Sequence, residues 1–403
     1  MKFKAWLVRA GVLGAALAMV GGCGDDAPSG STVGGECGDG VVEGYEQCDD
    51  GNADDTDGCT SQCIEWEAPA GDPVVADDHT WEWIDVPGAV CRDGSPAGFA
   101  VNLDSSSDRV MIYLEGGGAC FDQVSCGANP ARFDSSAFGG RSGGIFDRTH
   151  GDNPMAGWNH VYVPYCTGDV HAGLAEDVMV PGLDEPQQFV GYRNTGLFLE
   201  RIVPTFADAE LVVLTGASAG GFGAAANAAQ VQRDFGDVPV VLLDDSGPPM
   251  SSEQIAPCLQ AQWRELWGLE NTMLADCQWD CDDPDDFVVD LAVHLAQQNP
   301  DRVGGLFSHR QDQIIRFFYG FGQNECDYTI VPSSLPEDEF ERGLDDFKNV
   351  IQAETNNFGT YYTDGTDHTC IAGGCFYDAE VGGVPLTAWV ADLIDGQVSH
   401  VAP

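Results

Sequence analysis

The stretch Leu211-Val-Val-Leu-Thr-Gly216-Ala-Ser218-Ala-Gly220-Gly-Phe-Gly-Ala-Ala-Ala226 decides the fold. Its apolar start predicts a buried strand, and the alanine-rich end predicts a helix. Between them, Gly-x-Ser-x-Gly fits a sharp turn in which flanking side chains would collide with neighbouring elements. A glycine-rich chain, with 51 glycines here, can contain this pattern by chance, but the strand before it and the helix after it argue against chance. The context therefore predicts that Ser218 is a nucleophile.

Apolar runs alternate with longer helical stretches from about residue 67 onward. This alternation predicts an α/β-hydrolase fold, in which helices flank a mostly parallel sheet. The expected strands are 110–114, 159–163, 211–215, 238–243 and 303–308. The expected helices are 184–204, 220–234, 252–268 and 285–298.

A glycine-rich loop follows the early strand, in the sequence Tyr113-Leu-Glu-Gly-Gly-Gly-Ala-Cys120. Attack on an ester places negative charge on the carbonyl oxygen, so backbone N–H donors are needed near the nucleophile. Hydrolases of this fold carry such a loop at this point in the chain order. We expect the N–H groups of Gly117, Gly118 and Ala219 to form the oxyanion hole.

A nucleophilic serine also needs a base, and in this fold the base follows the acid along the chain. His368 is the best candidate because it lies in a turn-rich loop, Asp364 to Cys375, that a local disulfide could stiffen. His294 falls inside a helical pattern, His309 precedes the best acid, and His400 is three residues from the end of the sequence. We therefore predict His368 as the general base.

Asp312 is the predicted acid because it follows the strand 303–308 and opens the helical run Gln313–Tyr319. Asp244 and Asp245 end another strand and are its competitors. We expect those two residues to form a structural turn with Ser246-Gly-Pro248. Order and placement favour Asp312.

The N-terminal residues indicate export. Lys2, Lys4 and Arg9 precede the apolar run Ala10–Val20, which is too short to span a bilayer. We read residues 1–22 as a signal peptide that ends in Val-Gly-Gly-Cys23, a pattern that resembles a bacterial lipobox; an ordinary cleavage site beside a chance cysteine is the alternative. Lipidated Cys23 would then be the only membrane contact, and residues 23–36 form a flexible tether. The expected location is the cell surface or outer membrane, with release from the cell as an alternative.

Residues 37–66 form a Cys-rich module with four cysteines, too small to have much of a core without disulfides. Its CGDG, CDDGN and DGC elements resemble a short repeat of myxobacterial surface proteins. Its acidic cluster is an alternative calcium site, but it lacks the spacing of an EF-hand. We expect a spacer module, followed by a catalytic domain over residues 67–403.

The chain is strongly acidic, with 17 basic and 65 acidic residues and a formal net charge of -48. Nucleic acid and anionic membranes are excluded as partners, because both would be repelled. No HExxH motif and no clustered histidine spacing is present, so we expect no metal or cofactor.

Four motifs in order resemble the pectin acetylesterase/Notum family of carboxylesterases over residues 80 to 380. They are Leu114-Glu-Gly-Gly-Gly-Ala-Cys120-Phe, Pro164-Tyr-Cys-Thr-Gly-Asp-Val-His-Ala-Gly173, Gly216-Ala-Ser-Ala-Gly-Gly221 and Asp367-His-Thr-Cys370. The resemblance implies an α/β-hydrolase fold and a triad of Ser218, His368 and Asp312, with the looser match at Asp312. Gly118 and Ala119 stand where many relatives have an aromatic residue, which leaves the acyl preference open.

The resemblance also implies disulfides and a reaction. Fourteen cysteines remain when Cys23 is set aside, and the sequence leaves their pairing open. The implied reaction removes an O-acyl group, with acetyl on a polysaccharide such as pectin or xylan as the leading expectation. The alternatives are a Notum-like or lipase-like enzyme for longer acyl chains, a serine peptidase on the same fold, and a surface glycan-binding lipoprotein without turnover.

Overall fold

The computed structural model describes residues 37–42, 48–52, 57–60, 63, 65–277, 281, 283–298, 302–327 and 332–403. The predicted signal peptide, Cys23 and the tether lie outside these residues. Within them, no helix is long and apolar enough to cross a membrane. In the Cys-rich module, nested disulfides join Cys37 to Cys63 and Cys48 to Cys59.

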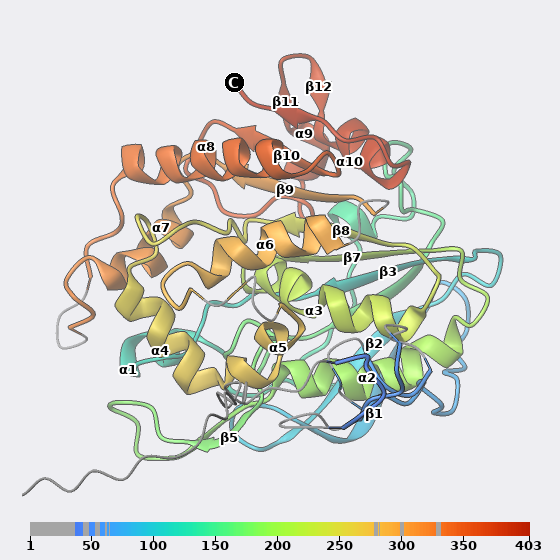
Figure 1. The fold of residues 1–403 in the computed structure, drawn as a ribbon. Helices are drawn as coiled ribbons and strands as arrows, with labels where there is room; N and C mark the ends of the chain where they lie inside the picture. The colour runs from blue at the N-terminus through green and yellow to red at the C-terminus, as the bar shows by residue number, and fades with distance from the viewer. Residues whose placement is uncertain are drawn as a thin grey trace, which may run out of the picture.

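A nine-stranded sheet organises the described part of the chain (Figure 1). Its order is β1 (Trp81–Val90), β2 (Pro96–Asn102), β4 (Asn159–Val163), β3 (Arg109–Leu114), β7 (Leu211–Ala217), β8 (Val240–Asp245), β9 (Gly304–His309), β10 (Phe358–Thr363) and β13 (His400–Val401). The β1–β2 and β2–β4 pairs are antiparallel, and the pairs from β4 to β13 are parallel. The predicted mostly parallel sheet is confirmed, with an antiparallel edge that the sequence had not indicated.

Helices cover both faces of this sheet (Figure 1). The longer ones are α2 (Gly191–Thr205), α3 (Ala219–Phe235), α4 (Pro257–Trp267), α6 (Phe287–Gln298), α8 (Glu337–Glu354) and α10 (Leu386–Ile394). Shorter ones are α1 (Gln123–Ala128), α5 (Met273–Cys277), α7 (Gln313–Tyr319) and α9 (Cys375–Asp378), and two small strand pairs are β5 (Ala175–Val178) with β6 (Gln187–Phe189) and β11 (Glu380–Val381) with β12 (Val384–Pro385).

Two buried clusters lie on opposite faces of the sheet, because side chains alternate along each strand. Along β3, Ile112 and Leu114 belong to the cluster that includes α3 side chains, whereas Met111 and Tyr113 belong to the cluster around Trp389 of α10. Continuous burial of the central strands explains why they read as apolar runs in the sequence.

Two predicted helices begin at least five residues later than expected. The helix expected over 184–204 begins at Gly191, because residues 187–189 pair as β6 and the buried Asp169 carboxylate accepts a hydrogen bond from Gly191 N at 2.7 Å. The helix expected over 252–268 begins at Pro257, which suits a first helical position because proline has no N–H. The sequence-based expectations did not include α8, β10 or the β1–β2 hairpin.

Candidate active site

Ser218 lies in the sharp turn between β7 and α3. Its φ of 60° and ψ of −123° are costly for a residue other than glycine, and such strain persists only where the surroundings impose it. The flanking glycines are required by close backbone contacts. A Cβ on Gly216 would lie 2.2 Å from the Gly220 carbonyl oxygen, and one on Gly220 would lie 1.9 Å from the Leu114 carbonyl oxygen. The predicted strand–turn–helix around Ser218 is confirmed.

His368 and Asp312 are brought together from elements 56 residues apart in the chain, with His368 Nδ1 lying 2.7 Å from Asp312 Oδ2. Asp312 is fully buried and caps α7, since its Oδ1 accepts hydrogen bonds from Ile314 N at 2.9 Å and Ile315 N at 3.0 Å. The cap fixes the carboxylate, so the second oxygen is held toward the imidazole ring. This bond leaves Nε2 of His368 available for proton transfer.

Ser218 is connected to the His368 loop through Asp245 at the end of β8. The Asp245 carbonyl accepts a hydrogen bond from Ser218 N at 2.7 Å. Its Oδ2 accepts from Cys370 N at 2.7 Å and from Ile371 N at 2.8 Å, just beyond His368. Among the described residues, no hydrogen bond joins the Ser218 hydroxyl itself to His368. Burial raises the pKa of Asp245 to about 6.

The turn expected at Asp244 and Asp245 is present, but it does more than the sequence indicated. Asp244 Oδ1 accepts from Gly247 N at 2.8 Å, and Ser246 Oγ donates to Asp245 Oδ1 at 2.9 Å. Neither carboxylate contacts His368 Nδ1, whose partner is Asp312. The link from Asp245 to the His368 loop was missed, and its one sequence signal is the position of Asp245 at the carboxyl end of a central strand.

The glycine-rich loop lies against the nucleophile. A Cβ on Gly116 would lie 2.9 Å from Ser218 Cβ. His171 Nε2 lies 2.8 Å from the Glu115 carbonyl oxygen, and Asn129 Nδ2 donates to the Gly117 carbonyl oxygen at 2.9 Å. Both contacts are made to carbonyl oxygens of the loop, so they hold the loop in place and leave its N–H groups unoccupied.

The proposed oxyanion donors are free in the described part of the chain. No hydrogen bond there uses the N–H groups of Gly117, Gly118 or Ala219. Ala219 N belongs to the first turn of α3, where N–H groups have no partner within the helix. The assignment of these three donors stays a prediction. His171 and Asn129, which hold the loop, were not identified from the sequence.

The three histidines that the sequence analysis weighed against His368 lie in other elements. His294 is buried within α6, as expected. His400 lies in β13 with its Nδ1 3.0 Å from Thr360 Oγ1, so the end of the chain is paired with the sheet there. His309 ends β9 and is buried close to Asp312, and burial lowers its pKa.

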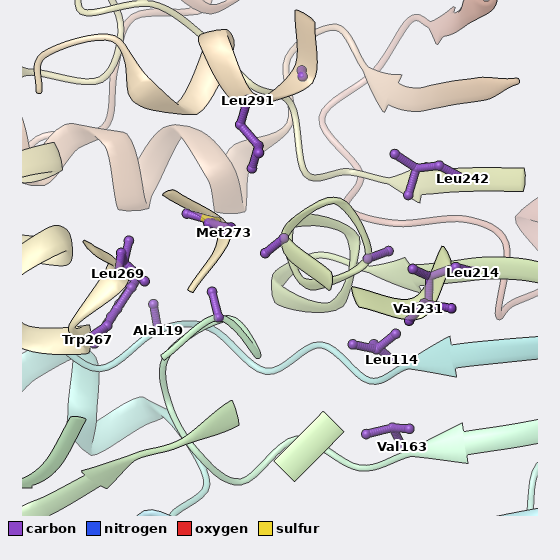
Figure 2. Close-up of a cluster of buried hydrophobic side chains, with 14 of the residues drawn as sticks. Leu114, Ala119, Val163, Leu214, Val231, Leu242, Trp267, Leu269, Met273 and Leu291 are labelled. Carbon is purple, nitrogen blue, oxygen red and sulfur yellow. The ribbon is translucent and has the colours of Figure 1, made fainter. Parts of the chain in front are cut away.

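An apolar cavity opens beside Ser218. It is bounded by the glycine-rich loop, by α3 to α7 and by the ends of the central strands. The residues drawn in Figure 2 that line it include Ala119, Trp267, Leu269, Met273, Leu291 and Leu242. Such a lining suits a hydrocarbon chain. Within the described residues, no group of three or more His, Cys, Asp or Glu side chains could hold a metal ion.

The remaining described cysteines form disulfides around the site. The pairs are Cys91–Cys166, Cys120–Cys126, Cys258–Cys326, Cys277–Cys281 and Cys370–Cys375. Cys120 follows the glycine-rich loop, and Cys370 lies two residues after His368. The stiffened loop that the sequence predicted around His368 is therefore present.

A family model described as pectinacetylesterase matches residues 80–282, which is 203 of the 403 residues. The chain belongs to the pectinacetylesterase family. The match includes Ser218 and the glycine-rich loop, whereas Asp312 and His368 lie beyond it. A second model, a domain of unknown function named DUF4215, matches residues 32–64 and is compatible with the predicted Cys-rich module.

Curated relatives include palmitoleoyl-protein carboxylesterases. The NOTUM protein of Drosophila melanogaster is 30% identical over 161 residues, 36% of this chain and 23% of that protein. The NOTUM protein of Mus musculus is 31% identical over 188 residues, 43% of this chain and 33% of that protein. A Danio rerio relative named inactive palmitoleoyl-protein carboxylesterase notum1b is 37% identical over 92 residues, 21% of this chain and 65% of that protein. The chain thus matches about a quarter to a third of the length of the two NOTUM relatives.

Proposed function

We propose that this member of the pectinacetylesterase family is a serine carboxylesterase. The observation that supports this most directly is the 2.7 Å contact between His368 and Asp312, in a structure that also places Ser218 in a strained turn. A nucleophile needs a base, and the base needs a partner that fixes its tautomer. The chain supplies all three groups at the carboxyl ends of its central strands.

In the proposed reaction, Ser218 Oγ attacks the ester carbonyl carbon while His368 Nε2 takes the hydroxyl proton. Asp312 holds the ring through Nδ1 and stabilises its charged form. The N–H groups of Gly117, Gly118 and Ala219 receive the oxyanion. The ester C–O bond then breaks, and His368 returns the proton to the departing alcohol. Water repeats the same steps on the acyl-enzyme and releases the carboxylic acid.

Two kinds of acyl group are candidates for the group that the enzyme removes. The family name, pectinacetylesterase, supports acetyl on a polysaccharide such as pectin or xylan. The apolar cavity, with a volume of about 100 Å³, supports an acyl chain of a few carbons, because an acetyl group would not fill it. The geometry favours the longer chain, and we take deacetylation as the second candidate. We also propose that the protein is exported and that a lipid on Cys23 anchors it to the membrane.

Hydrolysis of 4-nitrophenyl esters from acetyl to palmitoyl tests the proposal. The Ser218→Ala variant is compared with wild type and with Ser136→Ala, which removes an exposed hydroxyl that does not line the cavity. We expect turnover in wild type and Ser136→Ala, an optimum beyond acetyl, and background rates in Ser218→Ala. An optimum at acetyl would favour the second candidate. Equal background rates in all three proteins would instead favour the glycan-binding alternative, and cleavage of matched amides would favour the peptidase.

A further inference from the structure

Asp244 is a carboxyl group in the wall of an otherwise apolar cavity. It lies at the end of β8, is 3% exposed and lines the same cavity as Ser218. Its Oδ1 accepts a hydrogen bond from Gly247 N at 2.8 Å. Within the described residues, no other hydrogen bond reaches this carboxyl group. One oxygen therefore holds a turn, and the other has no protein partner.

No compensating positive charge faces Asp244 from the described lining of the cavity. Among these lining residues there is no lysine, arginine or histidine. Another polar group in the lining, the Tyr319 hydroxyl, donates to the Pro248 carbonyl oxygen at 2.6 Å. Burial raises the pKa of Asp244 well above its usual range, and the charge of Asp245 adds to this shift. Burial thus favours the protonated form of this carboxyl group, and a protonated carboxyl group can both donate and accept a hydrogen bond.

Asp244 lies close to the reacting atoms. Its strand position pairs with Gly216, two residues before Ser218. A Cβ on Gly221, in the first turn of the helix behind Ser218, would lie 2.1 Å from Asp244 Oδ1. Because Ser218 and Asp244 line the same cavity, an acyl chain that is attached to Ser218 and fills this cavity would lie against Asp244.

A second polar group of the cavity is also unused. Trp263 lines the cavity, and its indole Nε1–H is buried with no hydrogen-bond partner. Its neighbour Trp267, stacked on it, instead donates to the Cys120 carbonyl oxygen at 3.0 Å. Buried polar groups without partners are unfavourable, so two of them in one apolar cavity point to a ligand that has polar atoms of its own.

We propose that the enzyme selects acyl groups with a hydroxyl or keto oxygen within their first few carbons, and that Asp244 receives this oxygen. The inference rests on the proposed esterase function and specifies its substrate class. A site that hydrogen-bonds a substrate hydroxyl discriminates strongly against the analogue without it, because the protein group is then left unpaired. Asp244 is a specificity-determining residue here and takes no part in bond breaking.

The test compares 4-nitrophenyl butyrate with its 2-hydroxy and 3-hydroxy analogues. We expect at least one hydroxylated ester to show kcat/KM about tenfold above butyrate in wild type, the size of one net hydrogen bond. Asp244→Leu should reduce this ratio to about one, since it removes the polar group at similar volume. Asp244→Asn should retain the preference, because its amide can still accept from Gly247 N and donate to the substrate. Thermal unfolding of each variant shows whether the fold is kept, and Asp244→Ala replaces the leucine variant if that one unfolds.

A wild-type ratio near one for both hydroxylated esters overturns the inference, as does a preference that persists in Asp244→Leu. Absence of turnover of all three esters contradicts the esterase proposal instead. In that case, calorimetric binding of butyrate and 3-hydroxybutyrate decides the role of Asp244 without catalysis. Tighter binding of the hydroxylated acid that is lost in Asp244→Leu supports it, and equal affinities overturn it.

Discussion

Asp312 combines two roles at the scale of a single residue, because one oxygen caps α7 and the other lies 2.7 Å from His368 Nδ1. Asp312→Asn keeps an oxygen for the cap but presents an N–H group to the imidazole, which favours the wrong tautomer. We expect kcat for 4-nitrophenyl esters to fall about 10⁴-fold with little change in KM, as in other Ser-His-Asp enzymes.

Thermal unfolding is the control for Asp312→Asn, since loss of the cap would lower the stability of α7. The expected melting temperature is close to that of wild type. A loss of less than tenfold in kcat would show that another carboxylate, with Asp245 the nearest alternative, orients the base.

The sequence could predict the sharp turn at Ser218 and the pairing of Asp312 with His368 because these residues lie in local patterns. Ser218 has a strand before it and a helix after it, and Asp312 stands directly before a helical run. The role of Asp245 could not be predicted in the same way. Its partner Cys370 is 125 residues away, so the contact depends on how the loop after β10 folds back over β8. Local patterns carry no information about such contacts.

At the scale of elements, the end of β8 connects the nucleophile to the base. Asp245→Ala would leave Cys370 N and Ile371 N without their acceptor and loosen the loop that carries His368. A displacement of about 1 Å can cost about 10²-fold in rate, so we expect kcat to fall about 10- to 100-fold with KM unchanged. Asp245→Asn retains an acceptor oxygen and should recover most of the activity.

Steady-state kinetics on one ester, measured with both Asp245 variants and with wild type, separates kcat from KM. If Asp245 had only a structural role, its variants would contain less folded enzyme. The kcat per folded enzyme would then equal that of wild type in both variants. Equal kcat values for Asp245→Ala and wild type would contradict the positioning role.

Another element-scale prediction concerns His160 in β4. The residue is 1% exposed, its Nε2 lies 2.9 Å from the Met155 carbonyl oxygen, and burial lowers its pKa to about 4 from an ordinary value near 6.5. Because the unfolded chain binds this proton more tightly, the contribution of His160 to stability is present above pH 6.5 and is lost as the pH falls toward 4.

Urea unfolding at pH 7 and pH 4 measures this contribution. His160→Gln keeps an N–H donor for Met155 but cannot be protonated. Wild type should lose about 3 kcal/mol more stability than His160→Gln between the two pH values, since each pKa unit corresponds to about 1.4 kcal/mol. Identical losses in both proteins would show that His160 titrates normally in the folded state.

At the scale of the whole molecule, the sequence predicted the central parallel strands better than the edges of the sheet. The strands β3, β4, β7, β8 and β9 are buried on both faces and read as apolar runs. Most residues of the edge strand β1 are exposed or half-buried and its register contains an irregularity, and β13 has only two residues. Edge strands pair through tertiary contacts that their own residues barely signal, which is why the antiparallel edge was missed.

The net charge of -48 is also a property of the whole molecule, and it bears on the choice between substrates. A polyanionic substrate such as acetylated pectin is repelled over distances of about 30 Å at 0.01 M salt but only about 10 Å at 0.1 M. We therefore expect kcat/KM on acetylated pectin to rise about tenfold as salt increases over this range, because screening permits more productive encounters. Acetylated xylan and a neutral 4-nitrophenyl ester serve as uncharged controls, and acetate release with the xylan should change by less than about twofold. If pectin turnover were instead independent of salt, a local positive surface would have to guide that polymer to Ser218 despite the overall charge.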